Sequence, residues 1–203
     1  MQDLRYQFRC WLETIDIRNL VFIDETGINL AMTRLYGRAR GGARVSAQCP
    51  GNKGENITLI GAMSDEGLIA AMTLPGSLNT PSFLVFLEKV LLPQLWTGAI
   101  VVMDNLPVHY AHAAQLLLES VGAQIKFLPP YSPDLSPIEL CWSKLKEFSV
   151  RLKLAQLRLL MKQSQWLLML LLMIMPSVGF IIAGYFLSLL NTLLLGESVR
   201  KLL

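Results

Sequence analysis

The chain has 203 residues and a formal net charge of +3, enough length for one domain with a core and a basic excess compatible with a nucleic-acid partner. Its three cysteines, Cys10, Cys49 and Cys141, are far apart, and it contains only two histidines. This composition argues against a disulfide framework or a structural zinc site, and it favours a protein of the reducing cytoplasm.

The first half of the chain predicts a strand, a basic loop and a hairpin. The apolar run Leu20–Ile23 is typical of a buried strand, and it ends at Asp24. Two apolar runs flank the polar turn Ser64–Gly67, which predicts a β-hairpin over residues 56–77. The intervening segment is predicted to be a basic loop or hairpin, because glycines there are mixed with four arginines, Arg34, Arg38, Arg40 and Arg44.

A helix and a second buried strand are expected after the hairpin. Thr80 suits the N-cap and Pro81 the first position of a helix whose apolar face continues to Leu91. The run Ile100–Met103 then predicts another buried strand, and it too is followed by an acid, Asp104. Each of the two predicted buried strands thus leads directly into a carboxylate.

The remaining elements continue the alternation. A helix over residues 112–121 is ended by Gly122, and a strand follows over residues 123–128. A turn rich in proline then leads to a helix that starts at Pro137 and carries Glu139 in its first turn. Alternating strands and helices imply parallel crossovers, while the hairpin supplies antiparallel strands. The sequence therefore predicts an α/β fold with a mixed sheet flanked by helices.

The three acids named above have the chemistry of a divalent-metal site. If the two buried strands are neighbours, Asp24 and Asp104 lie at the same edge of the sheet, and the helix of Glu139 crosses that edge. Carboxylate oxygens are the ligands that Mg²⁺ and Mn²⁺ prefer, and two such ions would activate a nucleophile at a phosphodiester. The prolines before Glu139 would fix the direction in which it points.

Each acid also has an ordinary structural explanation. An aspartate after a strand is commonly a turn or cap residue, and a glutamate in a first helical turn commonly faces the helix dipole. It is the combination of all three that favours the catalytic interpretation. The neighbours Glu25 and Asn105 have two explanations, orientation of a metal-bound water or capping.

Three segments resemble the catalytic blocks of DDE transposases from bacterial insertion sequences related to mariner-like elements. They read FIDETG around Asp24, VVMDNLPVH around Asp104 and LPPYSPDLSPIELCWSKLK around Glu139. The last two acids are separated by 34 residues, 105 to 138, which matches that group. Ser136 stands where the group often has asparagine. The resemblance extends over residues 19–148.

The resemblance implies a ribonuclease-H-like fold and a site with two Mg²⁺ or Mn²⁺ ions held by Asp24, Asp104 and Glu139. It further implies cutting at transposon ends, joining of the freed 3′-OH to target DNA, and a homodimer when active. DNA, both transposon ends and target, would be the partner. The expected location is the cytoplasm, in association with the nucleoid.

Basic residues outside the triad are candidates for sequence-independent contacts with the DNA backbone. The alternative for each is an ordinary solvated side chain, or for the histidine a role at a helix N-terminus. The candidates are Arg34, Arg38, Arg40, Arg44, Lys53, His109, Lys144 and Lys146.

We expect the chain to have three parts. Residues 1–18 are a lead-in, residues 19–150 the ribonuclease-H-like catalytic domain, and residues 151–203 an apolar tail. The lead-in is too short for the helix-turn-helix module by which such transposases recognise DNA ends. We therefore expect end recognition to come from a separate helix-turn-helix chain, or the copy to be truncated.

The tail departs from the family pattern. The stretch Trp166–Gly196 contains no charged residue and predicts apolar helices interrupted at Pro176 and Gly179. A shifted reading frame explains this composition, and a membrane-attaching segment is the alternative. Other functions therefore remain open: a ribonuclease-H-like nuclease without strand transfer, an inactive remnant, or a membrane-attached protein without catalysis.

Overall fold

The computed structural model describes residues 2–29, 38–44, 46, 54 and 56–151. The predictions for Arg34, Lys53 and the tail lie outside these residues. No helix in this described part of the chain is both long enough and apolar enough to cross a membrane.

The centre of the molecule is a five-stranded sheet with the order β3-β2-β1-β4-β5. Its strands are β1 (Leu20–Asn29), β2 (Asn56–Ser64), β3 (Gly67–Pro75), β4 (Ile100–Met103) and β5 (Gln124–Phe127). The pairs β1–β2 and β2–β3 are antiparallel, whereas β1–β4 and β4–β5 are parallel. The predicted mixed sheet is confirmed, with the hairpin on one side and the crossovers on the other.

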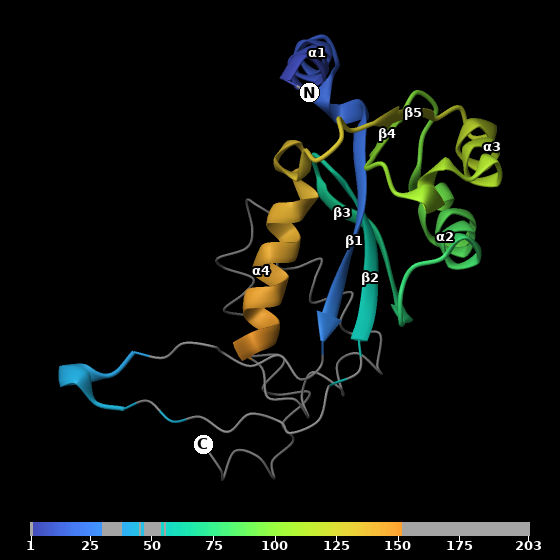
Figure 1. Cartoon of the computed structure of the whole chain (residues 1–203). Coiled ribbons are helices and arrows are strands. Elements are labelled where there is room, and N and C mark those ends of the chain that lie inside the picture. The colour runs from blue at the N-terminus through green and yellow to red at the C-terminus, as the bar shows by residue number, and fades with distance from the viewer. Residues whose placement is uncertain (1, 30–37, 45, 47–53, 55, 152–203) are drawn as a thin grey trace.

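Helices cover both faces of this sheet (Figure 1). They are α1 (Gln2–Glu13), α2 (Thr80–Phe86), α3 (His112–Ser120) and α4 (Ile138–Arg151). Side chains of α1 and α4 belong to the hydrophobic cluster on one face, and those of α2 and α3 to the cluster on the other. All four residues of β4 are buried, as expected for a central strand covered on both sides.

The second helix begins one residue earlier than the sequence indicates. Its N-cap is Asn79, whose side chain accepts a hydrogen bond from the Ser82 amide, and Thr80 is already inside the helix. After Phe86 the chain continues through a π-helical turn, Leu87–Leu91, which keeps the apolar face on the core. Both Asn and Thr can cap a helix, so the residue types alone do not decide between them.

The first helix was not predicted. Phe8 of α1 is buried, and Trp11, Leu12 and Ile15 pack beside it against the cluster that contains α4. Their spacing of three and four residues is the helical signal that was available in the sequence. The lead-in is therefore part of the packed structure.

Candidate active site

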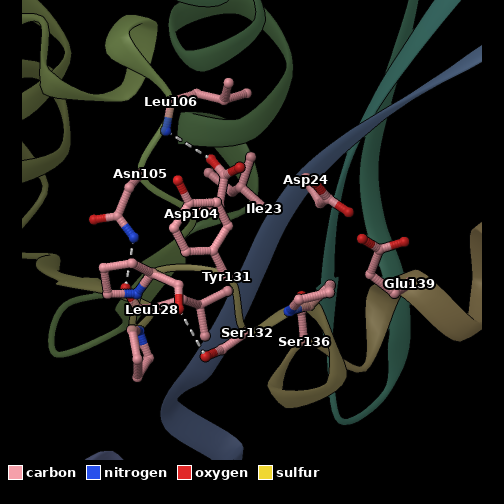
Figure 2. A pocket seen from close by; sticks show the side chains of 13 residues that line it. Ile23, Asp24, Asp104, Asn105, Leu106, Leu128, Tyr131, Ser132, Ser136 and Glu139 are labelled. Atoms are coloured by element: carbon pink, nitrogen blue, oxygen red, sulfur yellow. Dashed lines mark hydrogen bonds between the residues drawn. The ribbon is translucent and has the colours of Figure 1, made fainter. Parts of the chain in front are cut away.

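A cavity of about 380 Å³ opens at the edge of the sheet where β1 and β4 part (Figure 2). Carboxylates reach it from three different elements: Asp24 from β1, Asp104 from the segment after β4, and Glu139 from α4. The remaining lining residues are Ile23, Asn105, Leu106, Leu128, Pro129, Pro130, Tyr131, Ser132, Pro133 and Ser136.

Strand register brings the two aspartates to this edge. The last parallel pair between β1 and β4 is Phe22 with Val102, so Asp24 and Asp104 each lie two residues beyond it. However, Asp24 does not end its strand as predicted. β1 continues to Asn29 because β2 still pairs with it there, and Asp24 is opposite Gly61. The acid thus stands where β1 has a partner on only one side.

The proline-rich segment determines where α4 starts. Pro133–Leu135 forms a single 3₁₀ turn, closed by a hydrogen bond from the Ser136 amide to the Pro133 carbonyl. The helix then begins at Ile138, immediately after Pro137, which places Glu139 in its first turn. Tyr131, at the rim, has a φ of 54° and is 89% exposed. Its left-handed backbone lets the chain reverse direction between Pro130 and Ser132.

Asp24 has a strongly perturbed acidity. Burial and the neighbouring charges of Glu139 and Glu25 raise the pKa of its carboxyl to about 7. The indole Nε1 of Trp142 donates a hydrogen bond to its Oδ2 at 3.0 Å, which opposes this rise. Figure 2 shows the Asp24 and Glu139 side chains reaching toward one another. Trp142 itself is buried and packs in the core, so its hydrogen bond fixes one side of the site.

A glycine makes room for that indole. A Cβ on Gly61 would lie 2.8 Å from a ring atom of Trp142, too close for both to stay in place. We expect Gly61→Ala to destabilise the protein by about 1–3 kcal/mol, because the buried indole must shift away from Asp24. Gly27→Ala is a matched control on the neighbouring strand, where a Cβ meets nothing within 4 Å. Chemical denaturation of both variants tests this, and equal losses would contradict it.

Asp104 is tied to the residues that follow it. Its Oδ1 lies 2.8 Å from Nδ1 of His109 and accepts a hydrogen bond from the Leu106 amide at 3.1 Å. Burial alone would raise the pKa of the Asp104 carboxyl, but these contacts outweigh burial and the pKa is lowered. Asn105 donates from Nδ2 to the Leu128 carbonyl at 2.7 Å, which joins this segment to the start of the proline-rich loop. The position of Asp104 is therefore held by its own local segment.

His109 does not occupy the surface position that was predicted for a DNA contact. It is fully buried, so a DNA phosphate cannot reach it in this arrangement. Its Nε2 points instead to Oε2 of Glu25, 4.0 Å away. Burial raises the pKa of the Glu25 carboxyl, and the nearby histidine opposes that rise. Sequence spacing gave no signal for this arrangement, since the two residues are 84 positions apart.

The other basic candidates are spread over the surface. Among those the structure describes, Arg38, Arg40 and Arg44 lie in or beside the η2 turn (Arg40–Gly42), and Lys144 and Lys146 on α4; all five are exposed. None of them lines the cavity. The prediction that they contact a DNA backbone outside the cavity stays a prediction.

One basic residue near the site was missed. Arg5 of α1 makes a two-pronged ion pair with Asp134 and also donates to Ser132 Oγ at 2.9 Å. The first helix thereby contacts the proline-rich loop. We expect Arg5→Lys, which keeps the charge but loses the planar fork, to lower the activity of this site several-fold with little change in unfolding temperature. Arg9→Lys on the same helix is the control, and equal activities of the two variants would contradict this.

The cavity suits a divalent cation in its chemistry. Its charged groups are carboxylates. A cation would offset both the burial of Asp24 and the neighbouring charges of Glu139 and Glu25, which together raise its pKa. In this conformation, the carboxylates of Asp24, Asp104 and Glu139 do not form a coordination sphere. In the described part of the chain, no three His, Cys, Asp or Glu side chains lie close enough together to hold a metal ion. Figure 2 shows one carboxylate oxygen of Asp104 hydrogen-bonded to the Leu106 amide.

The sequence of the chain matches one family model, described as DDE superfamily endonuclease, over residues 19–156. The chain belongs to this family. A comparison of this endonuclease with curated protein sequences yields no match.

Solved structures with a similar fold include complexes of the Mos1 transposase. A pre-cleavage Mos1 transpososome matches 73% of this endonuclease with a TM-score of 0.61 at 20% identity, and 48% of that chain is covered. The Mos1 strand transfer complex and the mariner paired-end complex with Mn each match 73% with a TM-score of 0.58 at 20% identity, covering 46% and 47% of those chains. The expected ribonuclease-H-like fold is thereby confirmed. This chain spans about half the length of the transposase chains that it matches.

Proposed function

We propose that this DDE endonuclease is the catalytic part of a transposase, which cuts DNA at transposon ends and joins the freed 3′-OH to target DNA. The observation that carries the proposal is the meeting of Asp24, Asp104 and Glu139 at one cavity, from three elements of a DDE-family fold. The similar solved structures include a pre-cleavage transpososome and a strand transfer complex, which supports both halves of the reaction.

Asp24, Asp104 and Glu139 are the proposed catalytic residues, and the same three would hold Mg²⁺ or Mn²⁺. When bound, two such ions supply Lewis-acid stabilisation of the charge that develops on the scissile phosphate. Mn in one of the similar paired-end complexes supports this choice of metal. The hydrogen bond from Trp142 orients Asp24, and the 3₁₀ turn before α4 orients Glu139. In the cut, water attacks phosphorus and the 3′ oxygen leaves. In the joining step, that 3′-OH attacks a phosphorus of the target DNA and displaces the 3′ oxygen of the target strand.

The proposed partners are DNA and a second copy of the chain. The similar Mos1 complexes with a transposon end and with strand transfer support DNA as the substrate, and a homodimer is the proposed active form. Recognition of the transposon ends is proposed to come from a separate helix-turn-helix chain. An origin in a bacterial insertion sequence and association with the nucleoid are part of the proposal. Membrane attachment through the tail is the alternative for that segment.

The arginines of the η2 turn are proposed to contact the DNA backbone. If Arg38 and Arg40 each neutralise one phosphate, replacing both with glutamine should reduce the slope of log affinity against log salt by roughly 2. The measurement is fluorescence anisotropy with duplex DNA between low and moderate salt. Arg18→Gln with Lys89→Gln removes the same charge from exposed, ion-paired positions and serves as the control. An unchanged slope for the Arg38 and Arg40 variant would show that these side chains are solvated and do not contact DNA phosphates.

The test of the proposed function is a plasmid assay that needs no knowledge of the end sequence. We expect the full chain to nick supercoiled DNA in Mg²⁺ or Mn²⁺, and to join a labelled oligonucleotide with a free 3′-OH to the plasmid. EDTA should abolish both activities. Nicking without joining would identify a nuclease without strand transfer, and a folded protein with neither activity would identify an inactive remnant.

A further inference from the structure

His109 is enclosed between two acidic side chains and an aromatic ring. Its Nδ1 lies 2.8 Å from Asp104 Oδ1, and its Nε2 lies 4.0 Å from Glu25 Oε2. Phe83 of α2 packs against the imidazole, with ring centroids 4.8 Å apart. A fully buried histidine in these surroundings has a fixed orientation, and it cannot act on DNA directly.

The two oxygens of Asp104 have different surroundings. Oδ1 is engaged twice, by His109 and by the Leu106 amide. Among the residues that the structure describes, Oδ2 has no hydrogen-bond donor, and the side chain is 42% exposed. One oxygen is thus anchored to the protein, while the other is left for a ligand at the cavity.

The contact between His109 and Glu25 is too long for a hydrogen bond. Glu25 Oε2 and His109 Nε2 are both buried, and neither has a hydrogen-bond partner in the described part of the chain. An unpaired buried polar atom costs free energy, so two such atoms that face each other favour closing the gap. The separation of 4.0 Å between these two atoms is about 1 Å longer than a hydrogen bond, so a small shift of either side chain closes it.

We propose that His109 and Glu25 are positioning residues for Asp104. Glu25 orients the imidazole, and the imidazole anchors Oδ1 so that Oδ2 is presented to a divalent cation. The inference rests on the proposed metal-dependent function, which it deepens. Hydrogen-bonding partners behind a metal ligand commonly hold it in this way, and losing one typically weakens metal affinity about 10–100-fold.

The test uses the full chain and Mn²⁺ alone, with free Mn²⁺ followed by electron paramagnetic resonance. The amide nitrogen of His109→Asn falls near the place of Nδ1, whereas that of His109→Gln falls near the place of Nε2. His109→Leu removes both ring nitrogens and keeps a similar volume. We expect His109→Asn to bind Mn²⁺ almost as tightly as the parent, and the Gln and Leu variants to bind it about 10–100-fold more weakly. Unfolding midpoints recorded alongside separate lost folding from lost positioning.

A double-mutant cycle tests the role of Glu25. Glu25→Ala should weaken Mn²⁺ binding about 10-fold in the parent but have no further effect beside His109→Leu, because Glu25 acts through the ring. Glu119→Gln, an exposed carboxylate on α3, is the control for loss of negative charge. Additive losses for Glu25 and His109 would overturn this part of the inference.

Asp104→Asn separates failure of the inference from failure of the proposed function. If Asp104→Asn abolishes Mn²⁺ binding while His109→Leu leaves it unchanged or tightens it, the positioning role is wrong and the metal site stands. Equal losses in the Asn and Gln variants at position 109 would also overturn it. If Asp104→Asn itself leaves Mn²⁺ binding intact, the proposed metal site fails.

Discussion

Asp24→Asn is expected to inactivate the enzyme and, in the same molecule, to stabilise the metal-free fold at pH 8. The loss of activity follows from the proposed role of Asp24 as a metal ligand. The gain in stability follows from its environment, where burial and the charges of Glu139 and Glu25 disfavour an ionised carboxylate. An asparagine cannot ionise, and its side-chain oxygen can still accept the hydrogen bond from Trp142.

The pH dependence has a definite sign. The pKa of Asp24 is about 7 in the folded protein against an ordinary value of 3.8, so the folded state holds the proton more tightly. This carboxyl therefore supports folding fully below pH 4, and its contribution is lost as the pH rises from 4 through 7. Asn at this position removes that loss. We expect the stability difference in EDTA to grow between pH 4 and 7 and to reach roughly 2 kcal/mol at pH 8.

Denaturant titrations at pH 4, 6 and 8 measure this difference directly. Glu119→Gln, which removes an exposed carboxylate on α3, should show no such growth. Saturating Mg²⁺ should stabilise the parent but not the variant, because the ion stabilises only a protein that binds it. A difference that shrinks with rising pH would show that Asp24 is held as a stable carboxylate.

Glu139→Gln and Asp104→Asn should each lower Mg²⁺-dependent cleavage by more than about 100-fold, since even a partner behind a metal ligand is commonly worth 10–100-fold. DNA affinity should change little, because binding depends mainly on basic residues that contact phosphates. Plasmid nicking and anisotropy on the same preparations test both statements.

Glu88→Gln is the matched control for this pair. Glu88 is exposed and belongs to the turn Leu87–Leu91, which packs on the face of the sheet opposite α4. It should retain the parent rate. A triad variant that cleaves as fast as this control would remove its residue from the proposed site. A variant that cleaves slowly only because it is unfolded would show a lowered unfolding midpoint as well.

The strands could be predicted from the sequence because each is marked by residues that are close together in the chain. Apolar runs that end in acids identify buried strands, and the register of a parallel pair then brings Asp24 and Asp104 to one edge. The proline-rich turn likewise set the start of α4. The apolar runs and the proline-rich turn depend on residues close together in the chain, where hydrophobic pattern and backbone restriction are decisive.

The missed features depend on contacts between distant segments. Arg5 meets Asp134 across 129 positions, and Glu25 meets His109 only through the folded sheet. β1 runs past Asp24 because β2 pairs with it, which the β1 sequence does not show. The same reason explains His109, a polar residue that is buried because an acid and an aromatic ring enclose it.

The central claim is that Asp24, Asp104 and Glu139 share a divalent-metal site. Fe²⁺ bound in place of Mg²⁺ tests it directly, because radicals generated with ascorbate cut the polypeptide next to the bound ion. We predict cuts in the full chain near residues 24, 104 and 139, suppressed by excess Mg²⁺ and lost in Asp24→Asn. Cuts confined to other segments of the folded protein, or cuts that persist in Asp24→Asn, would contradict the account.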